Sequence, residues 1–216
     1  MPEIIDYKKE YKDLYSPKNE PTIIKVPVMN FAAVEGQGSP NETGGVNTPG
    51  EYQKALEVLY AVQYTIKMSK KSAQVPNWYF DYVVPPLEGL WWLADAKSDI
   101  KDKSKYKWIS MIRLPEFVNK EIFKWACGEA SKKKKLNTEK AYFFKYAEGL
   151  CVQCMHIGSY DSEPQTLALM DKFMSANNFT KDLNENRRHH EIYLCDPRKT
   201  APEKNKTILR IPVKNV

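Results

Sequence analysis

The sequence has little of what marks a secreted, membrane-spanning or low-complexity protein. Its 216 residues include only 4 cysteines and 9 glycines, too few for a disulfide scaffold or a collagen-like chain. No apolar run approaches the roughly 18 residues that a membrane-spanning helix needs. Acidic residues in Met1 to Asp6 stand where a signal peptide has a basic stretch and an apolar core. We therefore expect a cytoplasmic protein with reduced cysteines and no membrane contact.

Positive charge is concentrated in one half of the chain. The net charge is +6, and residues 1–110 are balanced, so the excess lies in residues 111–216. Its densest cluster is Lys132 to Lys135. A nucleic-acid-binding surface would interleave such residues with exposed aromatics or carry a recognition helix, and neither is apparent. Lysines at the C-terminal end of a helix are the simpler interpretation, so we expect no nucleic-acid partner.

Aromatic residues are abundant and give the first indication of function. They make up 12% of the chain, more than a core of this size needs. Tryptophan and tyrosine are the side chains that line apolar ligand pockets. Their surplus therefore favours a protein that binds a small molecule.

Periodicity predicts three helices and a series of short strands. The first helix spans residues 51–68. The second is opened by Pro115, and its inward face is Phe117, Val118, Ile122 and Trp125. The third spans residues 163–176 and buries Leu167, Met170, Phe173 and Met174. Residues 1–20 are expected to form an arm. Strands are predicted at residues 22–28, 31–35, 78–84, 88–93, 108–114, 141–146, 150–157, 190–195 and 207–213, with a turn at Pro85 and Pro86 between the third and fourth.

The two halves of the chain share one order of elements, which indicates a duplication. We expect an α+β fold in which residues 21–216 form one domain of two tandem β-α-β-β modules, at about residues 22–94 and 107–213. Two such modules joined along their strand edges would give an antiparallel sheet with helices on one face. The other face would hold a ligand cleft.

Glu191 is the leading candidate for chemistry. Strand alternation sends Glu191 and Tyr193 to one face and Ile192 and Leu194 to the other. If Ile192 and Leu194 pack on the helices, Glu191 lies in the groove, where a desolvated carboxylate could hold a cation or act as a general base. The alternative is an ordinary glutamate on a solvated strand face.

A second candidate segment runs from His156 to Tyr160. Gly158 permits a tight exit from strand to helix, and Tyr160 then lies at the rim of the groove, able to donate its hydroxyl to a ligand. The alternative is that Ser159 or Asp161 caps the helix and His156 forms a hydrogen bond in the core.

Several tryptophans are candidate walls of the groove. Trp91 and Trp92 are adjacent on a predicted strand, so one faces the helices and the other the groove, and alternation does not distinguish them. The full set of ligand-binding candidates is Trp78, Glu88, Trp91, Trp92, Trp108, His156 and Phe173.

The sequence offers no convincing metal or cofactor site. Cys151 and Cys154 have C-x-x-C spacing, but on a strand they project to opposite faces, and no second pair has zinc spacing. The turn Gly36-Gln37-Gly38 lacks the third glycine and the lysine of a phosphate-binding loop. We therefore expect no bound metal and no cofactor.

Four short motifs in order resemble the GyrI-like proteins, which share the small-molecule-binding domain of AraC-type and BmrR-type drug-sensing regulators. The motifs are Asp13-Leu14-Tyr15-Ser16-Pro17, Gly36-Gln37-Gly38-Ser39-Pro40-Asn41, Leu87-Glu88-Gly89-Leu90-Trp91-Trp92 and His190-Glu191-Ile192-Tyr193-Leu194-Cys195-Asp196-Pro197. The similarity runs from about residue 11 to residue 213. It implies two SHS2 (β-α-β-β) modules forming a cleft for large, flat, often cationic or aromatic molecules.

The resemblance also implies roles for single residues. The family pattern His-x-Gly-x-Tyr is matched by His156, Gly158 and Tyr160, and the buried glutamate of its Glu-x-Tyr strand by Glu191, with Tyr193 following. Ser39 stands where many relatives have an acidic residue. Residues 1–20 are too short for a helix-turn-helix, so the chain looks like the stand-alone branch of the family.

Two functions are compatible with these features. Some stand-alone relatives hydrolyse cyclopropanoid DNA-alkylating compounds related to the duocarmycins and yatakemycin. In such a hydrolase Glu191 would activate or orient one water, and Tyr160 or Tyr193 would donate to the oxygen where charge develops. Others only bind. We therefore expect a hydrolase that opens such strained rings, and the alternative is a non-catalytic module that sequesters or senses planar aromatic or cationic molecules.

Overall fold

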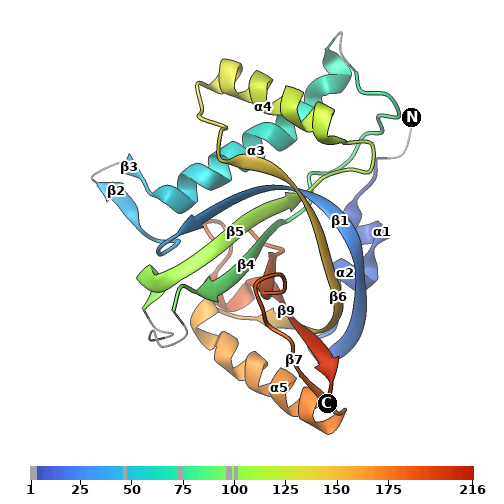
Figure 1. Ribbon diagram of the computed structural model, residues 1–216, viewed down its shortest axis with the longest axis vertical. Helices are drawn as coiled ribbons and strands as arrows, with labels where there is room; N and C mark the ends of the chain where they lie inside the picture. Colours follow the sequence, from blue (N-terminus) through green and yellow to red (C-terminus); the bar gives the residue numbers. More distant parts are fainter. Residues whose placement is uncertain (1–3, 46–47, 73–74, 96–98, 100–101) are drawn as a thin grey trace. The chain divides into compact units, whose positions relative to one another are not determined.

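The computed structural model describes residues 4–45, 48–72, 75–95, 99 and 102–216. As predicted, these residues form an α+β fold (Figure 1). The helices are α1 (Tyr7–Glu10), α2 (Lys12–Tyr15), α3 (Glu51–Met68), α4 (Lys120–Lys134) and α5 (Glu163–Ala176). The strands are β1 (Thr22–Gln37), β2 (Thr43–Gly45), β3 (Thr48–Pro49), β4 (Leu87–Leu93), β5 (Tyr106–Arg113), β6 (Ala141–Ile157), β7 (Phe179–Lys181), β8 (His189–Tyr193) and β9 (Lys206–Asn215).

Seven of the strands form an antiparallel sheet in the order β6-β1-β5-β4-β8-β9-β7, with a second pairing between β6 and β9. The chain divides into two compact units. The first consists of Met1–Asp6, Met29–Pro85 and Trp91–Tyr146, and the second of Tyr7–Val28, Pro86–Leu90 and Ala147–Val216. Strands β1, β4 and β6 contribute residues to both units. Because the units are discontinuous in sequence, the duplication at residues 22–94 and 107–213 stays a prediction.

Helix α3 is the centre of the first unit and forms where its apolar stripe predicts it. The face that it buries is Ala55, Val58, Leu59, Val62, Gln63 and Ile66. Gln63 is the one polar member, and its Nε2 donates to the carbonyl oxygens of Ile112 and Arg113 at 3.2 and 3.0 Å. These two bonds use the amide nitrogen of Gln63 and tie α3 to the end of β5. In Figure 1, α4 lies alongside α3 and runs in the opposite direction.

Helix α4 begins later than predicted. Pro115 starts a turn closed by the Val118 amide, and the helix itself begins at Lys120. The cause is Asn119, whose Oδ1 accepts a hydrogen bond from the Ile122 amide at 2.9 Å and caps the helix. Val118 is buried as predicted but precedes the helix, Phe117, Ile122 and Trp125 are only partly buried, and the buried residues of the helix itself are Phe123, Ala126 and Ala130.

Residues 78–84 do not form the predicted strand. Among the described residues of this segment, only Tyr82 forms a bridge, with Ile5. The segment is held to the end of α3 by side chains: the Tyr79 hydroxyl donates to the Lys67 carbonyl at 2.7 Å, and Lys67 Nζ donates to the Tyr82 carbonyl. These contacts replace ladder hydrogen bonds, so Pro85 and Pro86 do not join two strands of a hairpin.

Two pairs of predicted strands are each one continuous strand. Residues 22–28 and 31–35 both belong to β1, and residues 141–146 and 150–157 both belong to β6. Gly149, at which a break was expected, lies within β6 and has a φ of 74°, a left-handed value that glycine adopts without strain.

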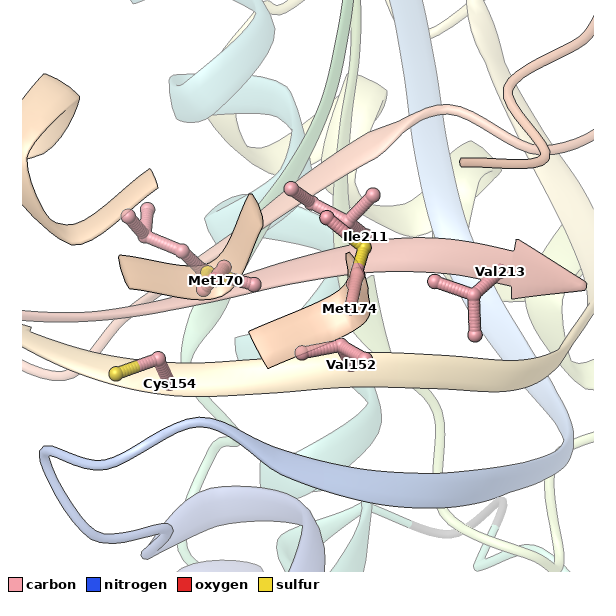
Figure 2. Close-up of a cluster of buried hydrophobic side chains, with 7 residues drawn as sticks. Val152, Cys154, Met170, Met174, Ile211 and Val213 are labelled. Carbon is pink, nitrogen blue, oxygen red and sulfur yellow. The ribbon is translucent and has the colours of Figure 1, made fainter. Parts of the chain in front are cut away.

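The core of the second unit lies between α5 and the strands β6 and β9. Figure 2 shows Met170 and Met174, one turn apart on α5, against Val152 and Cys154 of β6 and against Ile211 and Val213 of β9. Leu209 completes this cluster, and Leu167 and Phe173 pack at its edge partly buried. Burying each such side chain stabilises the fold by about 1.5–3 kcal/mol.

Within the described residues, none of the helices combines the length and apolar character needed to cross a membrane.

Candidate functional site

Glu191 and Tyr193 lie on one face of β8 and are joined directly. The Tyr193 hydroxyl donates to Glu191 Oε2 at 2.8 Å. His189 Nε2 lies 3.2 Å from the other carboxylate oxygen. The Glu191 side chain is only 15% exposed, so the alternative of a freely solvated glutamate does not describe it.

Tyr160 completes this group from the chain segment before α5. Its ring meets the Tyr193 ring edge-on, with centroids 6.1 Å apart and planes at 89°. Burial, followed by the negative charge of Glu191, raises the pKa of Tyr160 to about 12. Tyr160 therefore keeps its proton at neutral pH and can donate a hydrogen bond. The three predicted catalytic side chains are thus brought together.

The face that carries Glu191 differs from the expected one. In the pairing of β8 with β9, Glu191 lies opposite Leu209, which belongs to the cluster packed against α5. Directly opposite residues of an antiparallel pair project to the same face. In the second unit Glu191 therefore shares its face with α5. The expected arrangement, with Ile192 toward the helices and Glu191 away from them, is wrong for this helix.

His156 holds the corner between β6 and α5. Its Nδ1 lies 2.9 Å from Thr166 Oγ1, and its Nε2 lies 3.0 Å from the Ser159 carbonyl and 3.2 Å from Ser162 Oγ. Gly158 has a φ of 146°, and a Cβ there would lie 2.8 Å from Ser162 Oγ. Both ring nitrogens of His156 are used within this corner, so its geometry matches the structural alternative, and a ligand-binding role stays a prediction.

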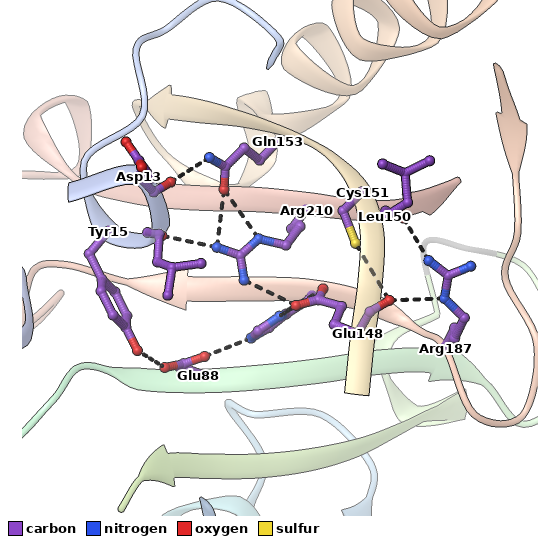
Figure 3. A network of polar contacts seen from close by, with 11 residues as sticks. Asp13, Tyr15, Glu88, Glu148, Leu150, Cys151, Gln153, Arg187 and Arg210 are labelled. Carbon is purple, nitrogen blue, oxygen red and sulfur yellow. Dashed lines mark hydrogen bonds and ion pairs between the residues drawn. The ribbon is translucent and has the colours of Figure 1, made fainter. Parts of the chain in front are cut away.

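The opposite face of β8 carries a buried ionic cluster (Figure 3). His190 is fully buried, with Nδ1 at 3.0 Å from Glu148 Oε1 and Nε2 at 3.0 Å from Glu88 Oε2. Arg210 Nη1 donates to Glu148 Oε2 at 3.0 Å. We call these four residues the ionic cluster: Glu88, Glu148, His190 and Arg210.

The N-terminal arm is fastened to the ionic cluster. The Tyr15 hydroxyl donates to Glu88 Oε1 at 3.1 Å, and Arg210 Nη2 donates to the Leu14 carbonyl at 2.9 Å. Gln153 bridges the two, because its Oε1 accepts from Arg210 and its Nε2 donates to the Asp13 carbonyl at 2.7 Å (Figure 3). Helix α2 is therefore anchored through its backbone carbonyls.

Opposite charges fix the protonation of the ionic cluster. Burial alone would raise the pKa of Glu148, but the charges of His190 and Arg210 outweigh it and lower that pKa to about 2. Burial would likewise lower the pKa of His190, but Glu148 and Glu88 raise it to about 9. At neutral pH we therefore assign His190 as an imidazolium between two carboxylates.

The predicted tryptophan walls all belong to the first unit. Trp108 is fully buried and meets the Tyr52 ring edge-on at 5.1 Å, and a Cβ at Gly36 would lie only 2.3 Å from its ring. Trp91 is partly buried beside Tyr52. Trp92 is also partly buried, and Trp78 is 90% exposed.

Glu88 and Phe173 belong to the second unit, where Glu88 is fully buried and Phe173 is partly buried. Glu88 is a member of the ionic cluster, and Phe173 packs on the core under α5. For these two residues and for the four tryptophans, ligand binding stays a prediction.

A cavity of about 770 Å³ lies between α3 and α4 in the first unit. Tyr60, Tyr64 and Met68 line it from α3, and Trp125 lines it from α4. None of the predicted ligand-binding residues is among the described residues that line it.

Comparison with known proteins identifies the family. The model of the GyrI-like small molecule binding domain matches residues 19–214. This chain belongs to the GyrI-like family. It therefore contains a small-molecule-binding domain of that family over nearly all of its length. None of the curated proteins compared gives a significant match.

Solved structures similar to this GyrI-like chain include three from Listeria innocua. A protein described as uncharacterized and conserved is 47% identical with a TM-score of 0.90, over 97% of this chain and 100% of that one. A protein described as a hydrolase encoded by lin2189 is 46% identical with a TM-score of 0.88, over 98% and 100%. The EcmrR C-terminal domain, 11% identical with a TM-score of 0.52 over 91% and 98%, shares the fold.

The ionic cluster of this GyrI-like chain was missed in the sequence. Its members are far apart in sequence, with a separation of 42 positions from Glu148 to His190 and of 62 from Glu148 to Arg210. One signal was available: Arg210 interrupts the apolar run of β9, and a charge inside a buried strand requires a charged partner. The sequence does not say which partner.

The cysteines of this GyrI-like chain are free thiols. Burial raises the pKa of Cys127 and of Cys154 to about 11, so both stay protonated at neutral pH. Within the part of the chain that the structure describes, no three His, Cys, Asp or Glu side chains are grouped as metal ligands.

Proposed function

We propose that this GyrI-like chain is a hydrolase that opens cyclopropanoid rings in planar, aromatic or cationic molecules of the duocarmycin and yatakemycin type. The observation that carries the proposal is the joined group on β8 and before α5: the Glu191 carboxylate, hydrogen-bonded by Tyr193 at 2.8 Å, with Tyr160 against Tyr193. A largely covered carboxylate beside a protonated phenol supplies a general base and a hydrogen-bond donor.

The proposed reaction adds one water across a strained carbon–carbon bond. Glu191 takes a proton from water while the water oxygen bonds to the least hindered cyclopropane carbon. The breaking ring bond sends its electron pair into the conjugated carbonyl, whose oxygen becomes a phenolate. Tyr160 stabilises this oxygen by donating a hydrogen bond, and the proton held by Glu191 returns to it to give the phenol. Tyr193 orients the carboxylate throughout.

Two observations support different outcomes. Two Listeria innocua structures that are 45% and 46% identical to this chain are described as hydrolases, which favours turnover. The family description names only the binding of small molecules, which favours the alternative of a non-catalytic binding module. Both outcomes use the same ligand class, so the decisive quantity is the chemical state of the recovered ligand.

The test is incubation of the full chain with a duocarmycin-type cyclopropanoid in ¹⁸O-labelled water, followed by mass spectrometry. We expect the ring-opened product to carry one labelled oxygen and to form with multiple turnovers per protein molecule. Glu191→Gln should lower this rate by about 10²-fold or more, as expected for loss of a general base. Glu203→Gln, which changes an exposed carboxylate on another segment, is the matched control and should keep the full rate.

Recovery of unchanged ligand together with saturable tryptophan quenching would establish the binding alternative. A full rate in Glu191→Gln would show that the reaction does not use this carboxylate. The first result would overturn the proposed activity. The second would overturn the proposed role of Glu191 in that activity.

A further inference from the structure

The site and the ionic cluster meet at two adjacent residues of β8. Glu191 projects toward the α5 side with Tyr193, and His190 projects to the other side into the ionic cluster. Because consecutive strand residues alternate in direction, fixing the side chain of His190 fixes the direction of Glu191. The two groups are linked through the peptide unit that joins His190 to Glu191.

Three strands besides β8 supply the groups around His190. Glu88 comes from β4, Glu148 from β6 and Arg210 from β9. Arg210 is also the register partner of His190 across the β8–β9 ladder. A shift of β8 by one residue would turn His190 away from both carboxylates and Glu191 into the interior. The cluster therefore specifies one register.

Stability alone does not explain a cluster of this kind. It places two carboxylates, an imidazolium and a guanidinium at positions that are 0–1% exposed. Removing such charges from water costs several kcal/mol per ion, and apolar residues of similar volume are often at least as stabilising. Charged side chains form directional contacts, which apolar side chains do not. Such contacts select one arrangement of the strands.

We propose that the ionic cluster is the positioning device of the Glu191–Tyr193 pair, and that His190 is a positioning residue of the site. The expected effect on kcat rests on the proposed function. The expected effect on the position of the Glu191 and Tyr193 side chains does not. Tyr15 reaches the same device through Glu88, so the arm is held by the groups that hold β8.

The test compares His190→Gln with Met174→Ala, which removes packing from a core cluster formed by residues of α5, β6 and β9. Glutamine is neutral and donates from a single nitrogen, whereas His190 faces Glu88 and Glu148 with two ring nitrogens, so the side chain of residue 190 is held less firmly. Under conditions where both variants are folded, we expect His190→Gln to lower kcat by about 10²-fold with little change in KM. Met174→Ala should keep kcat.

A second readout needs no turnover. In NMR spectra of the free protein, His190→Gln should shift the ring resonances of Tyr193 and lower the hydrogen-exchange protection of the Ile192 amide, and Met174→Ala should change neither. If the wild type has no hydrolase activity but these shifts occur, the proposed function fails and the positioning inference stands.

The inference would be overturned if His190→Gln lowers the stability of the protein but leaves the Tyr193 resonances and kcat at their wild-type values. The ionic cluster would then have a structural role only. If His190→Gln does not fold, Glu88→Gln removes one of the two ion pairs and is judged by the same two readouts. In that variant an unchanged Tyr193 environment would count against positioning, and a shifted one would support it.

Discussion

The Tyr193 hydroxyl donates to Glu191 across two residues of the same strand, at 2.8 Å. The two side chains neighbour each other because residues i and i+2 of a strand share a face. His189, two residues earlier on that face, reaches the second carboxylate oxygen. One strand of five residues thus places an imidazole, a carboxylate and a phenol in a row, so each can be changed without altering the others' backbone.

Removing the Tyr193 hydroxyl tests whether it orients the carboxylate. We expect Tyr193→Phe to fold and to lose between about 10- and 100-fold in kcat/KM for ring opening, because Glu191 gains rotamer freedom. The measurement is product formation at several substrate concentrations. Tyr64→Phe, on the exposed side of α3, is the matched control and should show the wild-type value. Equal rates in both variants would contradict an orienting hydroxyl.

The core under α5 provides a test of the packing shown in Figure 2. Met174 is 3% exposed among apolar neighbours from β6 and β9. Met174→Ala should lower the free energy of unfolding by about 2–5 kcal/mol, because it removes apolar contact and leaves a cavity. Leu169, on the same helix but 51% exposed, is the control, and Leu169→Ala should stay within about 0.5 kcal/mol. Urea unfolding curves measure both, and similar losses would contradict the assigned face of α5.

The pair of Arg210 and Glu148 tests the energetics of the ionic cluster. Arg210→Met leaves Glu148 and Glu88 with one positive partner, and we expect a loss of about 3–5 kcal/mol. Adding Glu148→Gln should recover part of it, giving a coupling energy of about 0.5–3 kcal/mol in a double-mutant cycle. Arg198, 85% exposed in its pair with Asp196, is the comparison, and Arg198→Met should change stability by less than about 0.5 kcal/mol. Additive losses for Arg210 and Glu148 would show that the two do not interact.

Local patterns predicted the parts of the fold that local forces determine. Helices α3 and α5 begin and end where their apolar periodicity does, because each buries one stripe along its length. The segment around Tyr79 was predicted as a strand because its residues are apolar and favour β structure. Hydrogen bonds to Lys67 instead fix it against the end of α3 in a conformation that is not a strand. That contact depends on where α3 ends in space, which no window of sequence contains.

For the site, alternation predicted which residues share a face but not which face. Glu191 and Tyr193 are neighbours as predicted, yet the side on which they lie depends on the register that sets Glu191 opposite Leu209. A strand pattern is unchanged when its two faces are exchanged, so only the partner strand decides. The same dependence on register hid the ionic cluster, although His190 was within a motif that the sequence singled out.

The protonation of His190 predicts how stability depends on pH. Its pKa is raised from the ordinary value of 6.5 to about 9, so the folded state binds the proton more tightly than the unfolded state does. The stabilisation from this group is therefore complete below pH 6.5 and is lost as the pH rises through 9. Glu148 acts in the opposite sense: its pKa falls from 4.5 to about 2, so its contribution is present above pH 4.5 and is lost as the pH falls toward 2.

These two groups together place the greatest stability of the wild type between the ordinary pKa values of Glu148 and His190. We expect the free energy of unfolding, measured in urea, to fall above neutral pH with a slope of up to about 1.4 kcal/mol per pH unit. His190→Gln lacks the titrating group, so its stability should be lower at mildly acidic pH and should change little across the same alkaline range. Subtracting the free energy of unfolding of the variant from that of the wild type removes the contributions of titrating groups that both proteins contain. Parallel curves for wild type and variant would show that His190 is not an imidazolium between Glu88 and Glu148.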